Sequence, residues 1–208
     1  MRDKLRLVIT GTPGVGKTTI AKELAARLGL EYVNLNEELI RRGVCKYNPE
    51  LSTYEITDVD KAVQILDTVV ESYARAVFDT LLVELLNPDL IDLVIVLRLD
   101  PRVLYRRLRN ERGWVGQKLC ENVLAEILDY FLIKSVENFG EDNVLEIDTT
   151  GKSIEDVINE ILNFLEGRNN EKREEKRVGI VSWLDKVDPS FLVCLDMCRE
   201  GLVTECEV

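Results

Sequence analysis

Residues 8–19 read Val8-Ile9-Thr10-Gly11-Thr12-Pro13-Gly14-Val15-Gly16-Lys17-Thr18-Thr19. The pattern G-x-x-x-x-G-K-[ST] is matched at each of its defined positions, which are Gly11, Gly16, Lys17 and Thr18. Glycines let backbone N–H groups close around phosphate oxygens, the lysine neutralises those oxygens, and the threonine hydroxyl reaches Mg²⁺. This stretch therefore predicts a phosphate-binding loop (P-loop).

The segments on both sides of the loop have the periodicities that such a loop requires. An apolar run over residues 5–10 predicts a buried strand. The next segment, residues 18–28, has one apolar helical face, formed by Ile20, Leu24, Ala25 and Leu28. The loop is thus expected at a helix N-terminus, whose free N–H groups face an anion. We expect the nucleotide phosphates to bind at Gly14, Gly16, Lys17, Thr18 and Thr19.

Composition and charge exclude several classes of function. The chain has 208 residues, of which 46% are hydrophobic, enough for one domain with a normal core. Its net charge of −11 argues against strong direct binding to nucleic acid and favours a basic protein partner. The chain has no histidine, so acid–base chemistry falls to carboxylates or lysine.

The sequence carries no pattern for export or membrane insertion. No run of about 18 apolar residues occurs, so no membrane span is expected. The amino terminus lacks the apolar core and small-residue cleavage site of a signal peptide. We therefore expect a cytoplasmic protein.

Five cysteines occur, namely Cys45, Cys120, Cys194, Cys198 and Cys206. Cytosolic thiols are normally reduced, and zinc sites usually show C-x-x-C spacing or histidines, so we expect buried, reduced side chains. A metal site or a disulfide among the last three is the alternative. The charged, Ile- and Val-rich composition with only two glutamines is typical of thermophiles, in some of which intracellular disulfides are common.

Beyond the loop, strand patterns alternate with helix patterns. Further strands are expected at residues 31–35, 75–78, 93–97 and 143–147, and helices at 59–74, 101–112, 117–138 and 153–165. Residues 93–97 form a continuous apolar run, which is typical of a strand buried on both faces of a parallel sheet. The alternation predicts an α/β P-loop NTPase fold, a doubly wound parallel sheet of five strands with helices on both faces.

A phosphate-binding loop identifies a nucleotide site but not its reaction. The Asn-Lys-x-Asp motif of GTPases is absent, since the late strand reads Leu145-Glu146-Ile147-Asp148-Thr149. The chain is also short for a motor or a transporter. Its size suits a nucleoside-monophosphate (NMP) kinase with a flap at about 34–58 for the acceptor and a short lid at about 109–119 for the donor.

The composition changes after Gly167. Residues 168–177 are almost wholly charged or Asn, which predicts a solvated linker. Asp188-Pro189 then begins a helix that ends near Gly201. We expect a kinase domain at 1–167 and, at 168–208, a charged linker with a helical appendage that packs on the core; a partner-binding helix is the alternative.

Several segments are shared with a known family: residues 11–19 and 94–100, Arg107-Leu108, Arg112-Gly113-Trp114, Lys118-Leu119, Glu121-Asn122 and Ala125-Glu126-Ile127. Over about residues 5–166 the chain resembles the atypical adenylate kinases, the family of nuclear adenylate kinase isoenzyme six and its archaeal counterparts. The resemblance implies Mg²⁺-dependent transfer from ATP to AMP with accompanying ATPase activity. It also implies a role in ribosome biogenesis and rRNA processing, as small-subunit maturation through a basic ribosomal protein.

Phosphoryl transfer works mainly by positioning and charge stabilisation. Lys17 and the backbone of residues 14–18 are expected to hold the β- and γ-phosphates of ATP, with Thr18 as a Mg²⁺ ligand. Asp79 ends a predicted strand at the expected ligand crevice, where it would hold Mg²⁺ through water or orient the acceptor. A strand-end turn is the alternative for Asp79.

The segment after that strand departs from the family pattern. Members of the family have an aspartate, one variable residue and a histidine, whereas this chain has Asp79-Thr80-Leu81. The missing histidine bears on ATP hydrolysis, or its coupling to a partner, more than on nucleotide binding.

The lid segment supplies a third catalytic candidate, Arg112. It precedes Gly113, where a closing lid would deliver the guanidinium to ATP. Trp114 would cover a base or pack the lid. Arg107 and Arg109 lie on an arginine-rich helix, which is more typical of a solvated face.

Candidates for the remaining contacts lie in the flap and after the last strand. Asn34 and Arg41, with Glu37 and Glu38, would contact the acceptor; an exposed helix is the alternative. Related kinases contact adenine through the segment that corresponds to residues 149–152, which assigns Lys152 to cofactor binding.

Two other functions fit the sequence. One is an assembly factor whose nucleotide site switches its affinity for a ribosomal protein, which the altered Leu81 segment and the carboxyl-terminal helix favour. The other is a small-metabolite kinase of the same fold.

Overall fold

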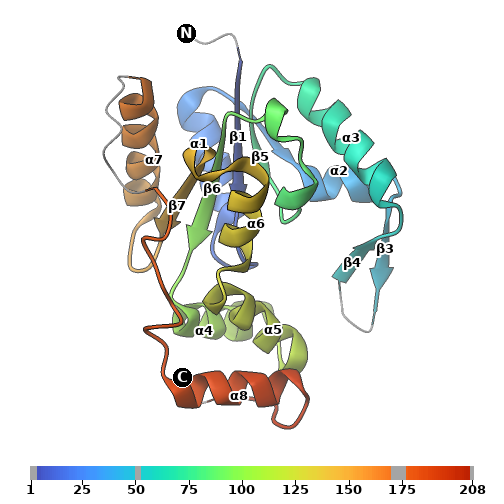
Figure 1. Cartoon of the computed structure of the whole chain (residues 1–208). Helices are drawn as coiled ribbons and strands as arrows, with labels where there is room; N and C mark the ends of the chain where they lie inside the picture. The colour runs from blue at the N-terminus through green and yellow to red at the C-terminus, as the bar shows by residue number, and fades with distance from the viewer. Residues whose placement is uncertain (1–3, 50–52, 170–176, 207–208) are drawn as a thin grey trace.

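Five parallel strands form the centre of the molecule (Figure 1). The computed structural model describes residues 4–49, 53–169 and 177–206. In the sheet the strands follow the order β2-β5-β1-β6-β7. Their bounds are β1 (Leu5–Thr10), β2 (Glu31–Asn34), β5 (Arg75–Asp79), β6 (Leu93–Arg98) and β7 (Val144–Asp148).

Helices cover both faces of this sheet. Successive side chains of a strand point to opposite faces, so Leu7 and Ile9 of β1 pack with α1 (Lys17–Leu28) and α7 (Ile154–Asn169). Val8 packs on the other side with α3 (Val59–Glu71) and α6 (Tyr130–Phe139). All six residues of β6 are buried, which explains its continuous apolar sequence. The predicted doubly wound parallel sheet is confirmed.

Capping residues set the ends of the helices after β6 and β7. Asp100 accepts hydrogen bonds from the amides of Arg102 and Val103 at the start of α4 (Pro101–Arg112). Ser153 and Asp156 exchange hydrogen bonds at the start of α7, an acidic form of the capping box. α7 spans 16 residues, and no helix among the described residues is long and apolar enough to cross a membrane.

The flap contains more regular structure than its sequence indicates. After α2 (Leu35–Arg41), the antiparallel strands β3 (Cys45–Asn48) and β4 (Thr53–Ile56) form a hairpin beside α3 (Figure 1). Both strands are largely exposed, so they lack the alternation of apolar and polar residues that would predict them. Short 3₁₀ turns complete the described secondary structure at η1 (Val83–Leu85), η2 (Pro88–Leu90) and η3 (Glu141–Asn143).

The single helix expected over residues 117–138 is wrong. Two helices occur instead, α5 (Gly116–Ile127) and α6. Asp129 between them has a φ of 56°, a left-handed conformation that aspartate tolerates better than most residues. This turn lets α6 pack on β6 and β7 while α5 contacts α4 and the carboxyl-terminal helix.

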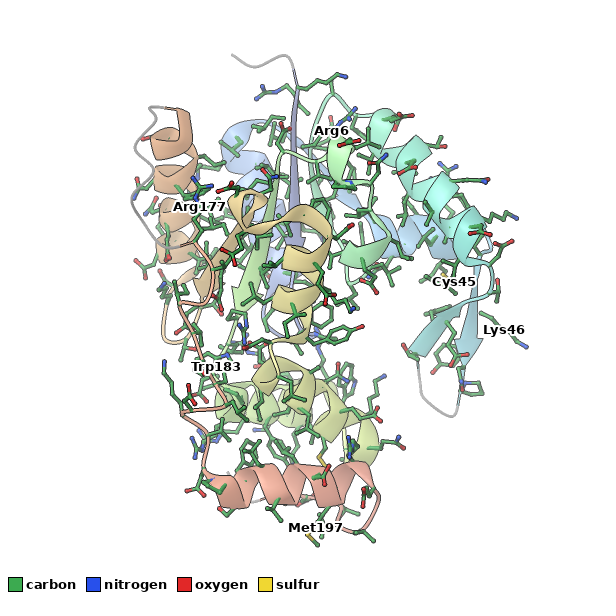
Figure 2. All side chains as sticks on the ribbon, in the orientation of Figure 1. Arg6, Cys45, Lys46, Arg177, Trp183 and Met197 are labelled. Carbon is green, nitrogen blue, oxygen red and sulfur yellow. A yellow bond between two sulfur atoms is a disulfide. The ribbon has the colours of Figure 1, made fainter. Side chains whose placement is uncertain are left out.

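The carboxyl-terminal helix α8 (Pro189–Arg199) packs across α5 (Figure 1). Phe191 and Leu195 are buried in the same core as α1 and α7, while Met197 lies on the outer side (Figure 2). The prediction that this helix packs on the core is confirmed. Most of the predicted charged linker, residues 170–176, lies outside the described residues, and the division near residue 167 stays a prediction.

Two disulfides hold the carboxyl-terminal segment, so the expectation of reduced cysteines is wrong. Cys120 of α5 is bonded to Cys198 of α8, and Cys194 is bonded to Cys206. Cys194 and Cys198, one helical turn apart, each pair elsewhere, and 78 positions separate Cys120 from its partner. Such a pairing depends on the packing of α8 on α5, which sequence spacing does not encode. Cys45 is a free thiol, and burial raises its pKa.

Thiol titration of the unfolded chain should therefore find one free thiol before reduction and five after it. Because each cross-link restricts the unfolded chain, reduction should lower the free energy of unfolding by about 2–4 kcal/mol per disulfide. Denaturant unfolding with and without reductant measures the loss. The variant Cys45→Ala should show no free thiol before reduction; free thiols from the other four cysteines would contradict the assignment.

Candidate functional site

The phosphate-binding loop lies between β1 and α1, packed tightly against its neighbours. Gly11 has a φ of 135°, and a Cβ atom there would lie 2.4 Å from the carbonyl oxygen of Leu97. A Cβ on Gly14 would lie 2.7 Å from a Leu108 methyl group. The guanidinium of Arg107 donates a hydrogen bond to the Gly14 carbonyl (3.0 Å), so Arg107 supports the loop rather than a solvated face. β6 and α4 thus hold the loop in shape.

Lys17 is the buried cation of the loop. Its Nζ donates a hydrogen bond to the Thr12 carbonyl oxygen at 3.1 Å. The pKa of Lys17 is lowered to about 8, chiefly by burial; Arg112 contributes to this shift, while Asp79 and Glu126 oppose it. The ammonium is therefore poorly solvated before an anion arrives, which strengthens its attraction for phosphate.

Nucleotide affinity should consequently fall as the pH rises through about 8, because Lys17 loses its proton. Bound phosphates favour the charged form, so binding above this pH takes up a proton, and affinity falls by at most about tenfold per pH unit. Calorimetric titration with ATP across this range measures the slope. The variant Lys17→Arg keeps its charge and should show a flat profile; equal slopes in both proteins would contradict the assignment.

Thr18 and Asp79, the two predicted Mg²⁺ ligands, lie together at the carboxyl ends of the central strands. The Thr18 hydroxyl donates to Asp79 Oδ2 at 2.6 Å, and the Tyr32 hydroxyl donates to the same oxygen at 3.3 Å. Burial, with Asp79 nearby, raises the pKa of Tyr32 to about 12. A buried carboxylate beside a hydroxyl is an oxygen donor set that suits Mg²⁺, which usually takes one or two carboxylates plus phosphates. Tyr32 was not predicted; Thr19 is exposed in the first turn of α1.

A cavity of about 830 Å³ opens between the loop, the flap and the lid. Its lining includes Pro13 of the loop, Tyr54 of the flap hairpin, Leu81, and Arg112 with Trp114 of the lid. The guanidinium of Arg112 lies 5.4 Å from the centre of the Trp114 ring. The lid and the flap hairpin therefore border the same space as Pro13 at the start of the phosphate loop, and Arg112 is part of its lining.

Lys118 is a lining residue of this cavity that was not predicted as a site residue. Its ammonium lies 4.3 Å from the centre of the Trp114 ring. Two cations, Arg112 before the lid turn and Lys118 after it, therefore lie close to the Trp114 ring.

The predicted flap residues Asn34 and Arg41 have local partners, among them the other two candidates, Glu37 and Glu38. Asn34 pairs with Asp79 across β2 and β5, and its side chain caps α2 by accepting from the amides of Asn36 and Glu37. Arg41 is exposed and forms an ion pair with Glu38 at 2.5 Å. Contact of either residue with an acceptor stays a prediction.

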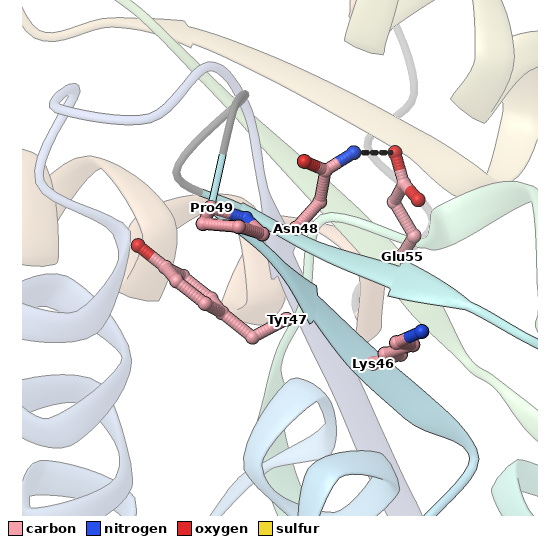
Figure 3. Close-up of a pocket in the computed structure, with 5 residues that line it drawn as sticks. All are labelled: Lys46, Tyr47, Asn48, Pro49 and Glu55. Carbon is pink, nitrogen blue, oxygen red and sulfur yellow. Dashed lines mark hydrogen bonds between the residues drawn. The ribbon is translucent and has the colours of Figure 1, made fainter.

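A second, smaller hollow of about 290 Å³ lies on the flap hairpin (Figure 3). It is lined by Lys46, Tyr47, Asn48, Pro49 and Glu55, and Asn48 donates to Glu55 at 2.9 Å. None of these residues belongs to the phosphate loop, so we do not assign the hollow to the nucleotide.

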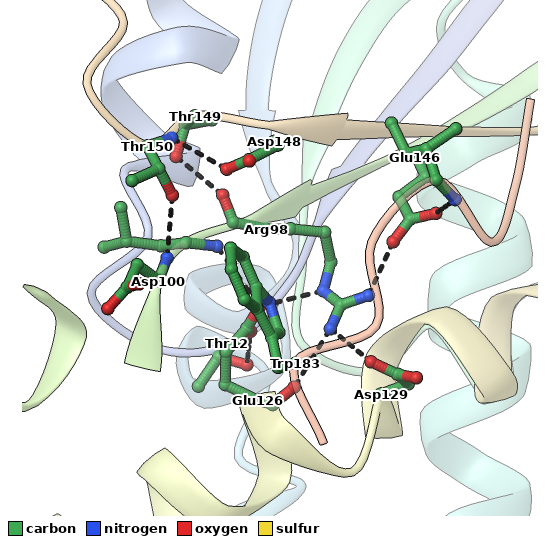
Figure 4. Close-up of polar contacts among 12 residues, drawn as sticks. Thr12, Arg98, Asp100, Glu126, Asp129, Glu146, Asp148, Thr149, Thr150 and Trp183 are labelled. Atoms are coloured by element: carbon green, nitrogen blue, oxygen red, sulfur yellow. Dashed lines mark hydrogen bonds and ion pairs between the residues drawn. The ribbon is translucent and has the colours of Figure 1, made fainter. Parts of the chain in front are cut away.

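The loop after β7 reaches the same edge of the sheet. The Thr149 hydroxyl donates to the carbonyl of Arg98, and the Thr150 hydroxyl accepts from the amide of Asp100 (Figure 4). Lys152 follows in this loop and pairs with Glu160 of α7 at 2.6 Å. Its contact with adenine stays a prediction.

Behind the loop lies a largely buried polar cluster that the sequence patterns did not indicate as part of the site. It consists of Arg98, Glu126, Asp129 and Glu146, which we call the Arg98 cluster (Figure 4). Arg98 pairs with Glu126 at 2.8 Å, with Glu146 at 2.6 Å and with Asp129. The signal available in the sequence is an arginine directly after a run of buried apolar residues, where a charge requires buried partners.

Comparison with known proteins identifies close relatives. Residues 7–129 match a family model described as an AAA domain. A Thermococcus gammatolerans protein named "Putative adenylate kinase" is 41% identical over 188 residues, which cover 88% of this chain and 94% of that protein. Proteins of the same name from Pyrococcus furiosus (40%, covering 85% and 90%) and Methanocaldococcus jannaschii (36%, covering 88% and 94%) also match.

Solved structures share the fold at low sequence identity. Shikimate kinase from Acinetobacter baumannii in complex with shikimate has a TM-score of 0.58 at 15% identity, covering 79% of this chain and 94% of its own. Thymidylate kinase from Candida albicans has a TM-score of 0.52 at 16% identity, covering 81% and 93%. These likenesses show the P-loop kinase fold and nothing finer.

Proposed function

Since this chain belongs to the family of these archaeal adenylate kinase relatives and is an NMP kinase of the P-loop fold, we propose that it transfers the γ-phosphate of ATP to AMP with Mg²⁺. One observation carries the proposal: the cavity of about 830 Å³ has the phosphate loop, the flap and the lid among its walls. A space bounded by these three elements suits a donor and an acceptor nucleotide together. Accompanying ATPase activity is part of the proposal.

The donor would be held by the loop. Backbone N–H groups of residues 14–18 and the ammonium of Lys17 bind its β- and γ-phosphates, with Gly14 and Gly16 allowing the close approach and Thr19 extending it. Thr18 and Asp79 would hold Mg²⁺, which neutralises charge on the phosphates when bound. Lys152 would contact the adenine.

The acceptor and the lid complete the proposed reaction. Asn34 and Arg41 would face AMP when the flap closes, after Arg41 leaves Glu38. Gly113, with a φ of 65°, ends α4 beside Arg112, so a turn there can carry the guanidinium from Trp114 to the transferring phosphate. The arginine would stabilise charge on that phosphate, while closure excludes water.

A nucleotide-switched assembly factor is the second candidate. Leu81, which stands where the resemblance expects a histidine, lines the cavity, so the group associated with hydrolysis is replaced by an apolar one. We also propose a role in small-subunit maturation through a basic ribosomal protein, which the net charge of −11 suits.

Incubation of the protein with ATP, Mg²⁺ and a panel of nucleoside monophosphates and small metabolites tests these proposals. Fast ADP formation that occurs with AMP and with no other acceptor of the panel supports the adenylate kinase. Slow phosphate release that does not depend on AMP supports the nucleotide-switched assembly factor. Phosphoryl transfer to a metabolite supports the small-metabolite kinase. Acceleration of phosphate release by a basic ribosomal protein would support the maturation role; its absence would count against it.

A further inference from the structure

The two carboxylate oxygens of Glu126 face different parts of the molecule. Glu126 lies on α5 and is buried, with 2% of its surface exposed. Its Oε2 accepts a hydrogen bond from the Thr12 hydroxyl of the phosphate loop at 2.5 Å. Its Oε1 accepts from Arg98 (2.8 Å) and from the amide of Leu99 (3.2 Å), both at the end of β6. One carboxylate thus ties the loop to the central sheet.

A third donor to Oε1 comes from the carboxyl-terminal segment. The indole Nε1–H of Trp183 donates to it at 3.1 Å, and the residue is buried, with 3% of its surface exposed (Figure 4). Figure 2 shows Trp183 on the segment of the chain that runs down to α8. Two further hydrogen bonds join this segment to β7. The amide of Ile180 donates to the Glu146 carboxylate, and the amide of Glu146 donates to the carbonyl of Arg177.

We propose that Glu126 and Trp183 are positioning residues of the nucleotide site, which set the shape of the phosphate loop through the Thr12 hydroxyl. The inference rests on the proposed function only in requiring that ATP binds at this loop. It assigns residues 177–187 to the support of the nucleotide site rather than to a separate appendage.

The geometry explains why such a support matters. The Thr12 carbonyl accepts the hydrogen bond of Lys17, so a shift of Thr12 moves the phosphate-binding ammonium with it. The other carboxylates that face Arg98, from Asp129 and Glu146, do not bond to the loop, whereas Glu126 does. Without the Trp183 bond, Oε1 of Glu126 keeps its donors Arg98 and Leu99 but loses its donor from the carboxyl-terminal segment.

A double-mutant cycle on ATP affinity tests the proposal. Thr12→Val removes the hydroxyl at constant shape, and Trp183→Phe removes the indole N–H while keeping an aromatic ring. Each variant should bind ATP with Mg²⁺ about three- to tenfold more weakly, the usual net contribution of one intramolecular hydrogen bond. Because Trp183 acts through Thr12, Trp183→Phe should weaken ATP binding less in the Thr12→Val background than in the wild-type protein. The two factors should differ by about threefold or more.

Matched variants separate positioning from general stability. Thr12→Ser keeps the hydroxyl and should restore wild-type affinity. Phe191→Leu disturbs the packing of α8 on Tyr105 without touching Glu126, so its effect should multiply with that of Thr12→Val. All affinities are measured by calorimetry well below the unfolding midpoint of the least stable variant.

Multiplicative effects of Thr12→Val and Trp183→Phe would overturn the proposal, as would wild-type affinity in Trp183→Phe. Failure of the proposed function has a different signature. The protein would then bind ATP with the expected coupling but form no ADP from AMP.

Discussion

Replacement of Lys17 by alanine is expected to reduce phosphoryl transfer from ATP about a hundred- to a thousandfold, the usual loss when one preorganised donor to developing charge is removed. Lys17 is a buried cation whose ammonium donates to the Thr12 carbonyl of the loop, while the charge of Asp79 acts on it without a direct ion pair among the described residues. Its removal leaves the loop backbone as the remaining phosphate ligand in this part of the site. Initial rates of ADP formation measure the loss.

The matched control is Lys61→Ala, which removes the same charge from an exposed position in the first turn of α3. It should leave transfer unchanged. Equal rates in the Lys17→Ala variant and the wild-type protein would show that the P-loop takes no part in the reaction. Each of the three candidate functions would then be contradicted.

The second large effect is on stability. Arg98→Met should lower the free energy of unfolding by about 3–5 kcal/mol, because removal of one member of a buried ionic cluster leaves uncompensated charge. Arg98 is 1% exposed and pairs with three carboxylates, so the variant strands Glu126 and Glu146 in the interior. Denaturant unfolding measures the change.

The direction of the pH dependence provides an independent check. Burial already raises the pKa of Glu146, and loss of the neighbouring guanidinium raises it further. Protonation removes the stranded charge, so the deficit of Arg98→Met relative to wild type should shrink as the pH falls. A control, Arg27→Met, removes an exposed ion pair with Glu155 and should change stability little. A deficit that grows toward acid pH would contradict the account.

Sequence patterns predicted those parts of the fold whose structure follows from the residues of the segment itself. The run at residues 93–97 predicts a strand buried on both faces because each position is apolar, and β6 is buried throughout. The flap hairpin escaped prediction because its strands are exposed and polar. The turn at Asp129 escaped because helical periodicity continues on both sides of it.

The candidate site divides in the same way. Thr18 and Asp79 were each predicted as Mg²⁺ ligands, Thr18 from the loop motif and Asp79 from its place at the end of a strand beside the ligand crevice. Glu126, Trp183 and the partner of Cys120 were not, because each depends on how the carboxyl-terminal segment packs on α5, and packing over such separations leaves no periodic pattern. The roles of Arg112, Arg41 and Lys152 in catalysis and binding stay predictions, as does the cytoplasmic location.

The bond from Trp183 to Glu126 also orders events during synthesis of the chain. The loop and its glutamate leave the ribosome well before residue 183 does, and folding begins with the earlier segment. The central strands can therefore assemble while Thr12 still lacks its full backing, and both disulfides must wait longer, for Cys198 and Cys206. A nascent chain that has formed the sheet but not yet released residue 183 would lack the indole bond to Glu126, and should bind ATP more weakly by the factor that Trp183→Phe costs.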